Sequence, residues 1–328
     1  MSPRARILVI VGVATALAAG GTVALAVITA SDKGGGEKKA TPLEGAPPVV
    51  LDLGVRVDPE ARALRRASRL LPRHRAAAGR IFSRYHSPGA QIGTAFAAWP
   101  DDSLAKVERL ARERPDDSLV LLHLGYAKLW SGHGDEASAA WQKAATAEPD
   151  TLSAQRANDV LHPNFPPGVP LFVPSFDPPV AIDRLSPPQQ FAYLRRKATG
   201  RDANAKLLYG LALQRLGQRI SARREYDAAA RLAPRDPEPQ VAAAVARFDK
   251  SRPAAAFSRL GPLTQRFPHA ATVRFHLGLL LLWFARAQPG ACADAKRQLR
   301  LARAEEPSSP LAREAKALLD SLEGVSIC

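Results

Sequence analysis

Apolar residues in the middle of this chain recur at the spacing of two consecutive amphipathic helices. The first helix is predicted over 206–216, where leucines follow the 3.6-residue period of an α-helix. Gly217 can end that helix, because glycine adopts positive φ at little cost. The second helix is predicted over 220–232, before Pro234. One of its faces carries small or aromatic residues: Ala222, Tyr226 and Ala229. Together the two segments predict a helical hairpin.

The same order of small, aromatic and proline positions recurs after 34 residues. The hairpin above contains Gly210, Ala222, Tyr226, Ala229 and Pro234. The following copy has Ala244, Ala256, Leu260, Leu263 and Pro268, and Gly278 begins another. An earlier copy has Gly125, Ala137, Trp141, Ala144 and Pro149. A single hairpin would leave one apolar face in water, whereas stacked hairpins bury it, so this period predicts a run of repeats.

This period and residue order resemble the tetratricopeptide repeat family, in which each repeat is a pair of antiparallel helices. The tryptophan that the family places near the start of the first helix is absent from every copy. The resemblance implies an all-α solenoid of helical hairpins. It also implies that the protein binds other proteins and is not an enzyme.

The pattern predicts a linear domain organisation. Its parts are a basic head at 1–6, a transmembrane helix at 7–30, a flexible linker at 31–58, degenerate helical repeats at 59–117, four recognisable repeats at 118–151, 203–236, 237–270 and 271–309, a degenerate repeat at 152–202 with a proline-rich insertion at 162–179, and a capping helix with a tail at 310–328. The repeat at 271–309 carries a short insertion. The string Pro-Asp-Asp-Ser-Leu occurs at 100–104 and 115–119, and each copy is expected to supply an Asp or Ser N-cap.

The N-terminal segment is expected to anchor the chain in a membrane. Residues 7–30 contain no charge and would span roughly 36 Å as a helix, against a hydrocarbon core of about 30 Å. A cleaved secretory signal is the alternative, with small-residue sites at 24–26 and 28–30. The positive-inside rule does not decide the orientation, because Arg4 and Arg6 precede the segment while Lys33, Lys38 and Lys39 follow it. A short basic head before an apolar run usually stays inside, so the repeats are expected outside a bacterial-type plasma membrane.

The two cysteines are consistent with an exported domain. Cys292 lies in the insertion of the last repeat and Cys328 is the last residue. A disulfide between them would join the tail to the end of the solenoid. Two unrelated thiols are the alternative. Neither cysteine belongs to a Cys-x-x-Cys motif, so neither metal binding nor redox catalysis is expected.

The chain is strongly basic, with a formal net charge of +15 and a pI of about 10.4. One stretch contains no acid and eight arginines: Arg62, Arg65, Arg66, Arg69, Arg73, Arg75, Arg80 and Arg84. This basic patch could contact anionic lipid or another polyanion. Solvated helix faces are the alternative interpretation. Nucleic acid is not expected as a partner, because no nucleic-acid-binding motif is present.

In the family that this chain resembles, the first helix of each repeat lines a concave groove. The corresponding positions are His123, Tyr126, Trp130, Asn204, Leu208, Leu211, Arg215, Val245, Phe248, Phe275, His276, Leu279 and Trp283. Such a groove suits an amphipathic helix or an extended apolar peptide. Packing between neighbouring helices is the alternative role for several of these side chains.

Residues 162–179 contain too many prolines for a helix and too many phenylalanines for a solvated linker. We expect this segment to lie along the concave face and partly fill it. The alternative is a proline-rich ligand for a partner.

No catalytic, cofactor or metal motif is recognised in the sequence. The sequence therefore predicts a membrane-tethered scaffold that binds a peptide or helix of a partner protein during envelope protein assembly. The alternative is an electrostatic adaptor that binds anionic lipid or another polyanion. Binding in an apolar groove should depend weakly on salt, whereas polyanion binding should fall steeply with salt.

Overall fold

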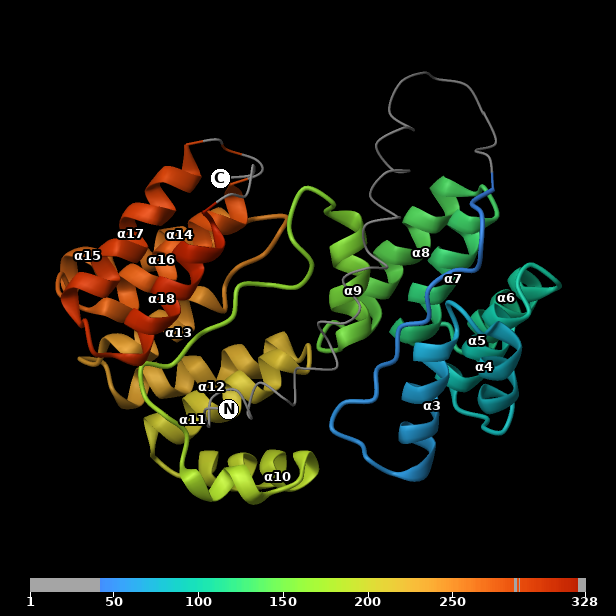
Figure 1. Cartoon of the computed structure of the whole chain (residues 1–328), viewed down its shortest axis with the longest axis horizontal. Coiled ribbons are helices and arrows are strands. Elements are labelled where there is room, and N and C mark those ends of the chain that lie inside the picture. The colour runs from blue at the N-terminus through green and yellow to red at the C-terminus, as the bar shows by residue number, and fades with distance from the viewer. Residues whose placement is uncertain (1–41, 286–287, 289, 324–328) are drawn as a thin grey trace. The chain divides into compact units, whose positions relative to one another are not determined.

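A computed structural model describes residues 42–285, 288 and 290–323, and this part of the chain is helical without strands (Figure 1). Its contacts divide it into two compact units, an N-terminal unit at 42–163 and a C-terminal unit at 164–323. Each unit is described by itself. The expectation of an all-α fold is confirmed for the described residues.

The N-terminal unit consists of consecutive helix pairs followed by a single helix. The helices are α3 (Pro59–Leu70), α4 (Arg75–Phe82), α5 (Pro88–Ala97), α6 (Ser103–Glu113), α7 (Ser118–Trp130), α8 (Gly134–Ala147) and α9 (Leu152–Leu161). Each odd-numbered helix up to α7 packs against its successor, and α9 packs against α8 and α7. The first helices α3, α5 and α7 also contact one another in sequence, so they form one continuous face.

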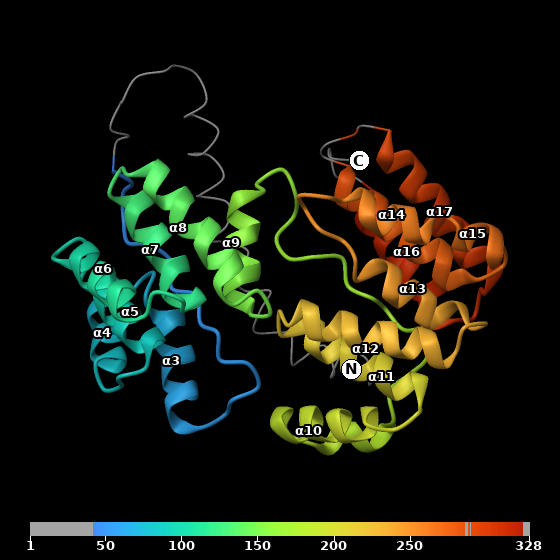
Figure 2. The same ribbon diagram turned by 180° about the vertical axis from the view of Figure 1, so that it is seen from behind.

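The C-terminal unit repeats this plan after a short 3-10 helix and one additional α-helix. Its helices are η3 (Val180–Arg184), α10 (Pro187–Ala198), α11 (Ala203–Arg215), α12 (Arg219–Leu232), α13 (Pro237–Val245), α14 (Ala254–Leu260), α15 (Leu263–Arg266), α16 (Ala271–Phe284), α17 (Ala291–Glu305) and α18 (Pro310–Ser321). The pairs are α11 with α12, α13 with α14 and α15, and α16 with α17, and α18 packs on α17 (Figure 2). The first helices α11, α13 and α16 again adjoin one another.

Small residues allow the two helices of a pair to approach closely. A Cβ atom at Gly125 would lie 2.2 Å from the indole Nε1 of Trp141, and one at Gly210 would lie 2.5 Å from Cε1 of Tyr226. Both rings are buried in the cores of their units. Gly217, predicted to end a helix, has a φ of +80°. The predicted role of Gly217 is therefore confirmed, and the small repeat positions Gly125 and Gly210 lie where the two helices of a pair approach closely.

The two copies of Pro-Asp-Asp-Ser-Leu behave differently. Oδ1 of Asp117 accepts hydrogen bonds from the N–H groups of Leu119 and Val120, as expected of an N-cap. Asp102 instead has a φ of +50° and makes no capping bond. Ser103 donates through Oγ to the carbonyl of Ala95, 2.6 Å away. The predicted cap at the first copy is therefore wrong, because Ser103 is committed to the preceding helix.

The predicted linker at 31–58 ends earlier than the sequence suggested. Val49 and Val50 are buried against the helices of the N-terminal unit. The predicted transmembrane segment at 7–30 and the rest of 1–41 lie outside the described residues. Among the residues that the structure describes, no helix is long and apolar enough to cross a membrane.

Candidate functional site

The C-terminal unit holds an extended segment, here called the C-terminal strap (residues 165–176), across its first helices (Figure 1). Each first helix contributes one side chain that bonds to the strap's main chain: Gln214 of α11, Glu238 of α13 and His276 of α16. Gln214 both accepts from the N–H of Phe172, at 3.3 Å, and donates to the carbonyl of Pro170, at 3.0 Å. These three side chains therefore bind the strap through its backbone.

Phenylalanine side chains fix the C-terminal strap in the core. The ring of Phe172 is fully buried, 5.6 Å from Tyr226 and stacked on His276 at 5.3 Å. Phe165 contacts Phe248 and Phe284 edge-on. Residues 165–176 of the segment predicted at 162–179 therefore pack on the first helices, whereas the prediction that this face is concave stays a prediction.

The N-terminal unit has a corresponding segment, the N-terminal strap (residues 43–53). The N–H of Leu43 donates to the carbonyl of Trp130, and the N–H of Val50 donates to Nε2 of His123 at 2.9 Å. Asp52 accepts two hydrogen bonds from Ser153 of α9, both 3.2 Å long. These residues belong to the flexible linker predicted at 31–58, and that prediction is wrong for them because they pack on the helices.

A buried histidine anchors each strap in the same way. Nδ1 of His123 lies 2.7 Å from the carbonyl of Leu119, and Nδ1 of His276 lies 2.7 Å from the carbonyl of Thr272. Nε2 accepts from the strap in both cases, so Nδ1 must carry the proton. Burial lowers the pKa of both imidazoles to about 4, which keeps them neutral near pH 7.

The correspondence extends along the sequence. His-Leu-Gly occurs at 123–125 and 276–278, and Leu-Trp follows at 129–130 and 282–283. The straps also match, as Gly-Ala-Pro-Pro-Val-Val at 45–50 and Gly-Val-Pro-Leu-Phe-Val at 168–173. Both leading glycines, Gly45 and Gly168, have positive φ. The chain thus contains two copies of one plan: a strap, three helix pairs and a closing helix. These recurring short motifs are the sequence signal from which the N-terminal strap could have been predicted.

Most predicted groove residues lie in the core of their unit. The buried ones are His123, Tyr126, Trp130, Leu208, Leu211, Val245, Phe248, Phe275 and His276. Leu279, Trp283 and Arg215 are half-buried, and Asn204 is exposed in the first turn of α11. The two histidines bind the straps directly, while Tyr126 packs edge-on against Trp130 and Trp141.

The predicted basic patch lies on α3, α4 and their connections. Arg65 donates to the carbonyls of Arg56 and Gly54, Arg62 donates to that of Val57, and Arg75 donates to that of Trp99. The remaining members are exposed and form no ion pair within the described residues: Arg66, Arg69, Arg73, Arg80 and Arg84. The patch therefore divides into arginines that bind their own backbone and arginines that face solvent.

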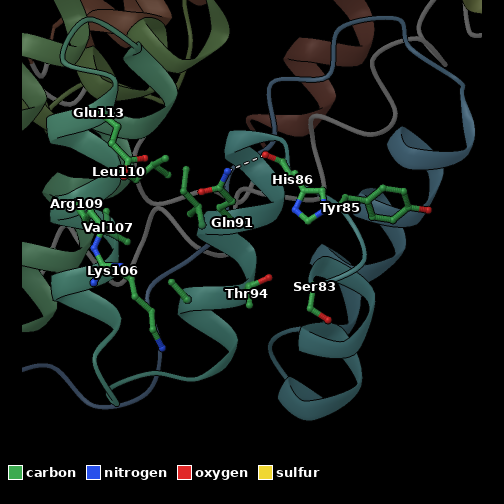
Figure 3. A pocket seen from close by; sticks show the side chains of 12 residues that line it. Ser83, Tyr85, His86, Gln91, Thr94, Lys106, Val107, Arg109, Leu110 and Glu113 are labelled. Carbon is green, nitrogen blue, oxygen red and sulfur yellow. Dashed lines mark hydrogen bonds between the residues drawn. The ribbon is translucent and has the colours of Figure 1, made fainter.

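A surface pocket of about 400 Å³ lies between α5, α6 and the end of α4 (Figure 3). Lys106, Arg109 and Glu113 of α6 form one wall, and Ser83, Tyr85 and His86 lie opposite. Gln91 of α5 donates to the carbonyl of His86 at 2.7 Å. This pocket was not predicted from the sequence, because the residue pattern of a single helix does not reveal which neighbouring helix it faces.

Cys292 is buried in the first turn of α17, whereas Cys328 lies outside the described residues, so their disulfide stays a prediction. Within the described part of the chain, no cluster of His, Cys, Asp and Glu has the arrangement of a metal site. No protein-family model matches the sequence, and no curated protein matches it either. The two strapped helix faces are therefore interpreted from their geometry alone.

Proposed function

We propose that the protein is a membrane-tethered interaction scaffold of the tetratricopeptide type, whose helix faces bind extended peptide segments of partner proteins in cell-envelope assembly. The observation that carries this proposal is the duplicated recognition of a strap's backbone by the first helices. Backbone recognition combined with buried apolar side chains is a general mode of peptide binding. The uncharged segment at 7–30 supports the tether.

In this proposal, each strap occupies the helix face on which a partner's peptide segment would bind. A covalently attached segment competes at an effective concentration of about millimolar when its connection is short. A partner therefore binds only when its segment fits better than the strap, or when the strap has been released. The two faces are then peptide-binding sites that the chain's own straps block.

The test compares the full chain in detergent with a variant whose C-terminal strap is loosened. Val173→Pro removes the N–H that donates to His276 but keeps an extended backbone. A fluorescent peptide with the sequence of residues 165–176 should bind this variant saturably and bind the wild type weakly. Val173→Ala keeps the N–H and is the matched control.

The peptide itself supplies the second control. A version with alanine at the position of Phe172 should lose binding, because that ring is fully buried in the strapped face. If the Val173→Pro protein keeps its helical circular dichroism but binds neither peptide, the helix face is a structural core and the proposal is wrong.

The exposed arginines of α3 and α4 support a second candidate, the electrostatic adaptor. Arg66, Arg69 and Arg80 face solvent without acidic partners in the described structure. Binding of vesicles containing phosphatidylglycerol should then fall steeply with salt and fall with Arg66→Gln and Arg69→Gln. Salt-independent binding would exclude the adaptor.

A further inference from the structure

A second surface pocket, of about 530 Å³, lies between α12, α13 and the α14–α15 segment of the C-terminal unit. Four arginines line it: Arg231, Arg247, Arg259 and Arg266. One acid, Asp227, is also present, so the formal charge of the lining is +3. We refer to this site as the arginine pocket. The pocket is distinct from the face that the C-terminal strap covers. In α13, for example, Glu238 binds the strap, whereas Gln240 and Ala243 line the pocket.

Two of the four guanidinium groups are held in place by the protein. Arg247 pairs with Asp227 at 2.9 Å. Arg266 donates to the carbonyl of Pro234 at 2.6 Å, and its guanidinium lies 5.1 Å from the centre of the Phe267 ring. Fixed donors lose little conformational freedom when they bind a ligand, which favours affinity.

The other two arginines leave their donors available. Arg231 and Arg259 are exposed and form no hydrogen bond or ion pair with any other described residue. Each guanidinium presents N–H groups in a planar fork that matches the oxygens of a phosphate. The arginine pocket thus combines two arginines held by the protein, Arg247 and Arg266, with two whose donors are available to a ligand, Arg231 and Arg259.

The corresponding pocket of the N-terminal unit differs from the arginine pocket in the charge of its lining. Gln91 and Gln240 occupy equivalent positions, and each donates to a carbonyl of the preceding segment. However, Lys106 stands where Arg259 does, and Glu113 stands where Arg266 does. The same architecture is therefore nearly balanced in charge in one copy and strongly cationic in the other.

The charge of the two sequence segments differs in the same sense. Residues 42–163 contain 16 Lys and Arg against 15 Asp and Glu, whereas residues 164–328 contain 25 against 14. The surrounding field of the C-terminal segment therefore adds to the local attraction for an anion.

From this comparison we propose that the arginine pocket binds a ligand carrying two or more phosphate groups. A single carboxylate would engage one guanidinium fork and leave most of the cationic lining uncompensated. Neighbouring phosphates supply several charged oxygens, enough for the fixed arginines and the two free ones together. The same chemistry occurs in a soluble polyphosphate and in a lipid headgroup with two phosphates.

Tripolyphosphate is the probe, and the full chain in a neutral detergent is titrated with it by calorimetry. Saturable binding is expected for the wild type. The double variant Arg231→Gln with Arg259→Gln should weaken binding at least about tenfold, or about 1.4 kcal/mol. Both positions are exposed, so the thermal unfolding of the protein should not change.

Two control variants carry the same change in charge. Lys106→Gln with Arg109→Gln alters the corresponding pocket, and Arg300→Gln with Arg303→Gln alters another cationic pocket, at α17 and α18. Both should bind tripolyphosphate like the wild type. Equal losses in all three double variants, or binding that does not saturate, would overturn the proposal in favour of a diffuse field.

A charge-preserving variant tests the geometry. Arg231→Lys with Arg259→Lys keeps both charges but loses the forks, and it should bind more weakly than the wild type. Undiminished binding would also overturn the proposal. Phosphatidylcholine vesicles with and without cardiolipin then identify the source. If Arg231→Gln with Arg259→Gln lowers the cardiolipin-dependent binding, the ligand is a headgroup, and if it lowers only tripolyphosphate binding, the ligand is soluble.

Discussion

Each unit holds its strap by an equivalent buried histidine, His123 or His276, but the other contacts to the two straps differ. In the N-terminal unit, valines fill the helix face and Asp52 binds Ser153 of the closing helix. In the C-terminal unit, Phe172 fills the face, and Gln214 and Glu238 bind the backbone. The histidine bond to the strap is shared, and the surrounding contacts differ between the two units. The comparison predicts that the histidine sets the position of each strap, whereas the neighbouring side chains set how strongly the strap is held.

The largest expected difference concerns the strap side chains. Phe172→Ala should destabilise the C-terminal unit by about 3–5 kcal/mol, because a large ring leaves a core cavity. The counterpart Val49→Ala should cost the N-terminal unit only about 2 kcal/mol, at about 0.8 kcal/mol for each buried carbon group removed. Urea unfolding, monitored separately in each unit by hydrogen exchange, measures the loss of stability in both variants. Equal losses of stability in the two variants would contradict the proposed difference in strap strength.

A second pair of variants tests the close helix approach. Gly125→Ala should cost about 1–3 kcal/mol, since its Cβ would meet the rigid ring of Trp141. Gly278→Ala at the equivalent position should cost less, because its Cβ would meet Cγ of Leu299 at 2.9 Å and the carbonyl oxygen of Ala295 at 3.2 Å, both longer than the 2.2 Å contact at Gly125. Thermal unfolding of the two proteins measures the difference. A larger effect at Gly278 would contradict the packing described for these pairs.

Acid should weaken both straps through their histidines. The pKa of His123 and of His276 is about 4 in the folded state against about 6.5 in the unfolded chain, so the unfolded state takes up protons first as the pH falls. At about 1.36 kcal/mol for each pKa unit, each histidine removes about 3 kcal/mol between pH 6.5 and 4. His123→Gln and His276→Gln should each flatten the fall of stability in their own unit. An unchanged pH profile would contradict neutral buried imidazoles.

The carboxyl group of Glu238 distinguishes the two units in the same pH range. Burial raises its pKa to about 7, so the folded state favours the protonated form and gains stability as the pH falls from 7 to about 4.5. Glu238→Gln should therefore make the C-terminal unit more sensitive to acid. The N-terminal unit, with Gly89 at the equivalent position, should be unaffected. Unfolding curves of the variant at several pH values decide this.

The smallest effect is expected at the exposed arginines. Arg66→Gln and Arg69→Gln should change stability by less than about 0.5 kcal/mol, because neither side chain has a partner in the described structure. Thermal unfolding measures this. A clear loss would show that the basic patch stabilises α3.

Local patterns in the sequence predicted much of the helical architecture. The 34-residue period located the close glycine–aromatic pairs, and proline density combined with phenylalanine revealed the C-terminal strap. The N-terminal strap was missed because its apolar part is short and follows a glycine- and lysine-rich stretch. His123 and His276 were placed on the right helices, but their bonds join residues 73 and 103 positions apart, which no local pattern shows.

The central claim is that two equivalent straps are parts of the folded units. Native-state hydrogen exchange of the Val50 and Val173 amides tests it most directly, because each donates to an anchoring histidine. Both amides should be protected about as strongly as the cores of α7 and α16. If either amide exchanges at the rate of an unfolded chain while those cores stay protected, the account of two anchored straps is wrong.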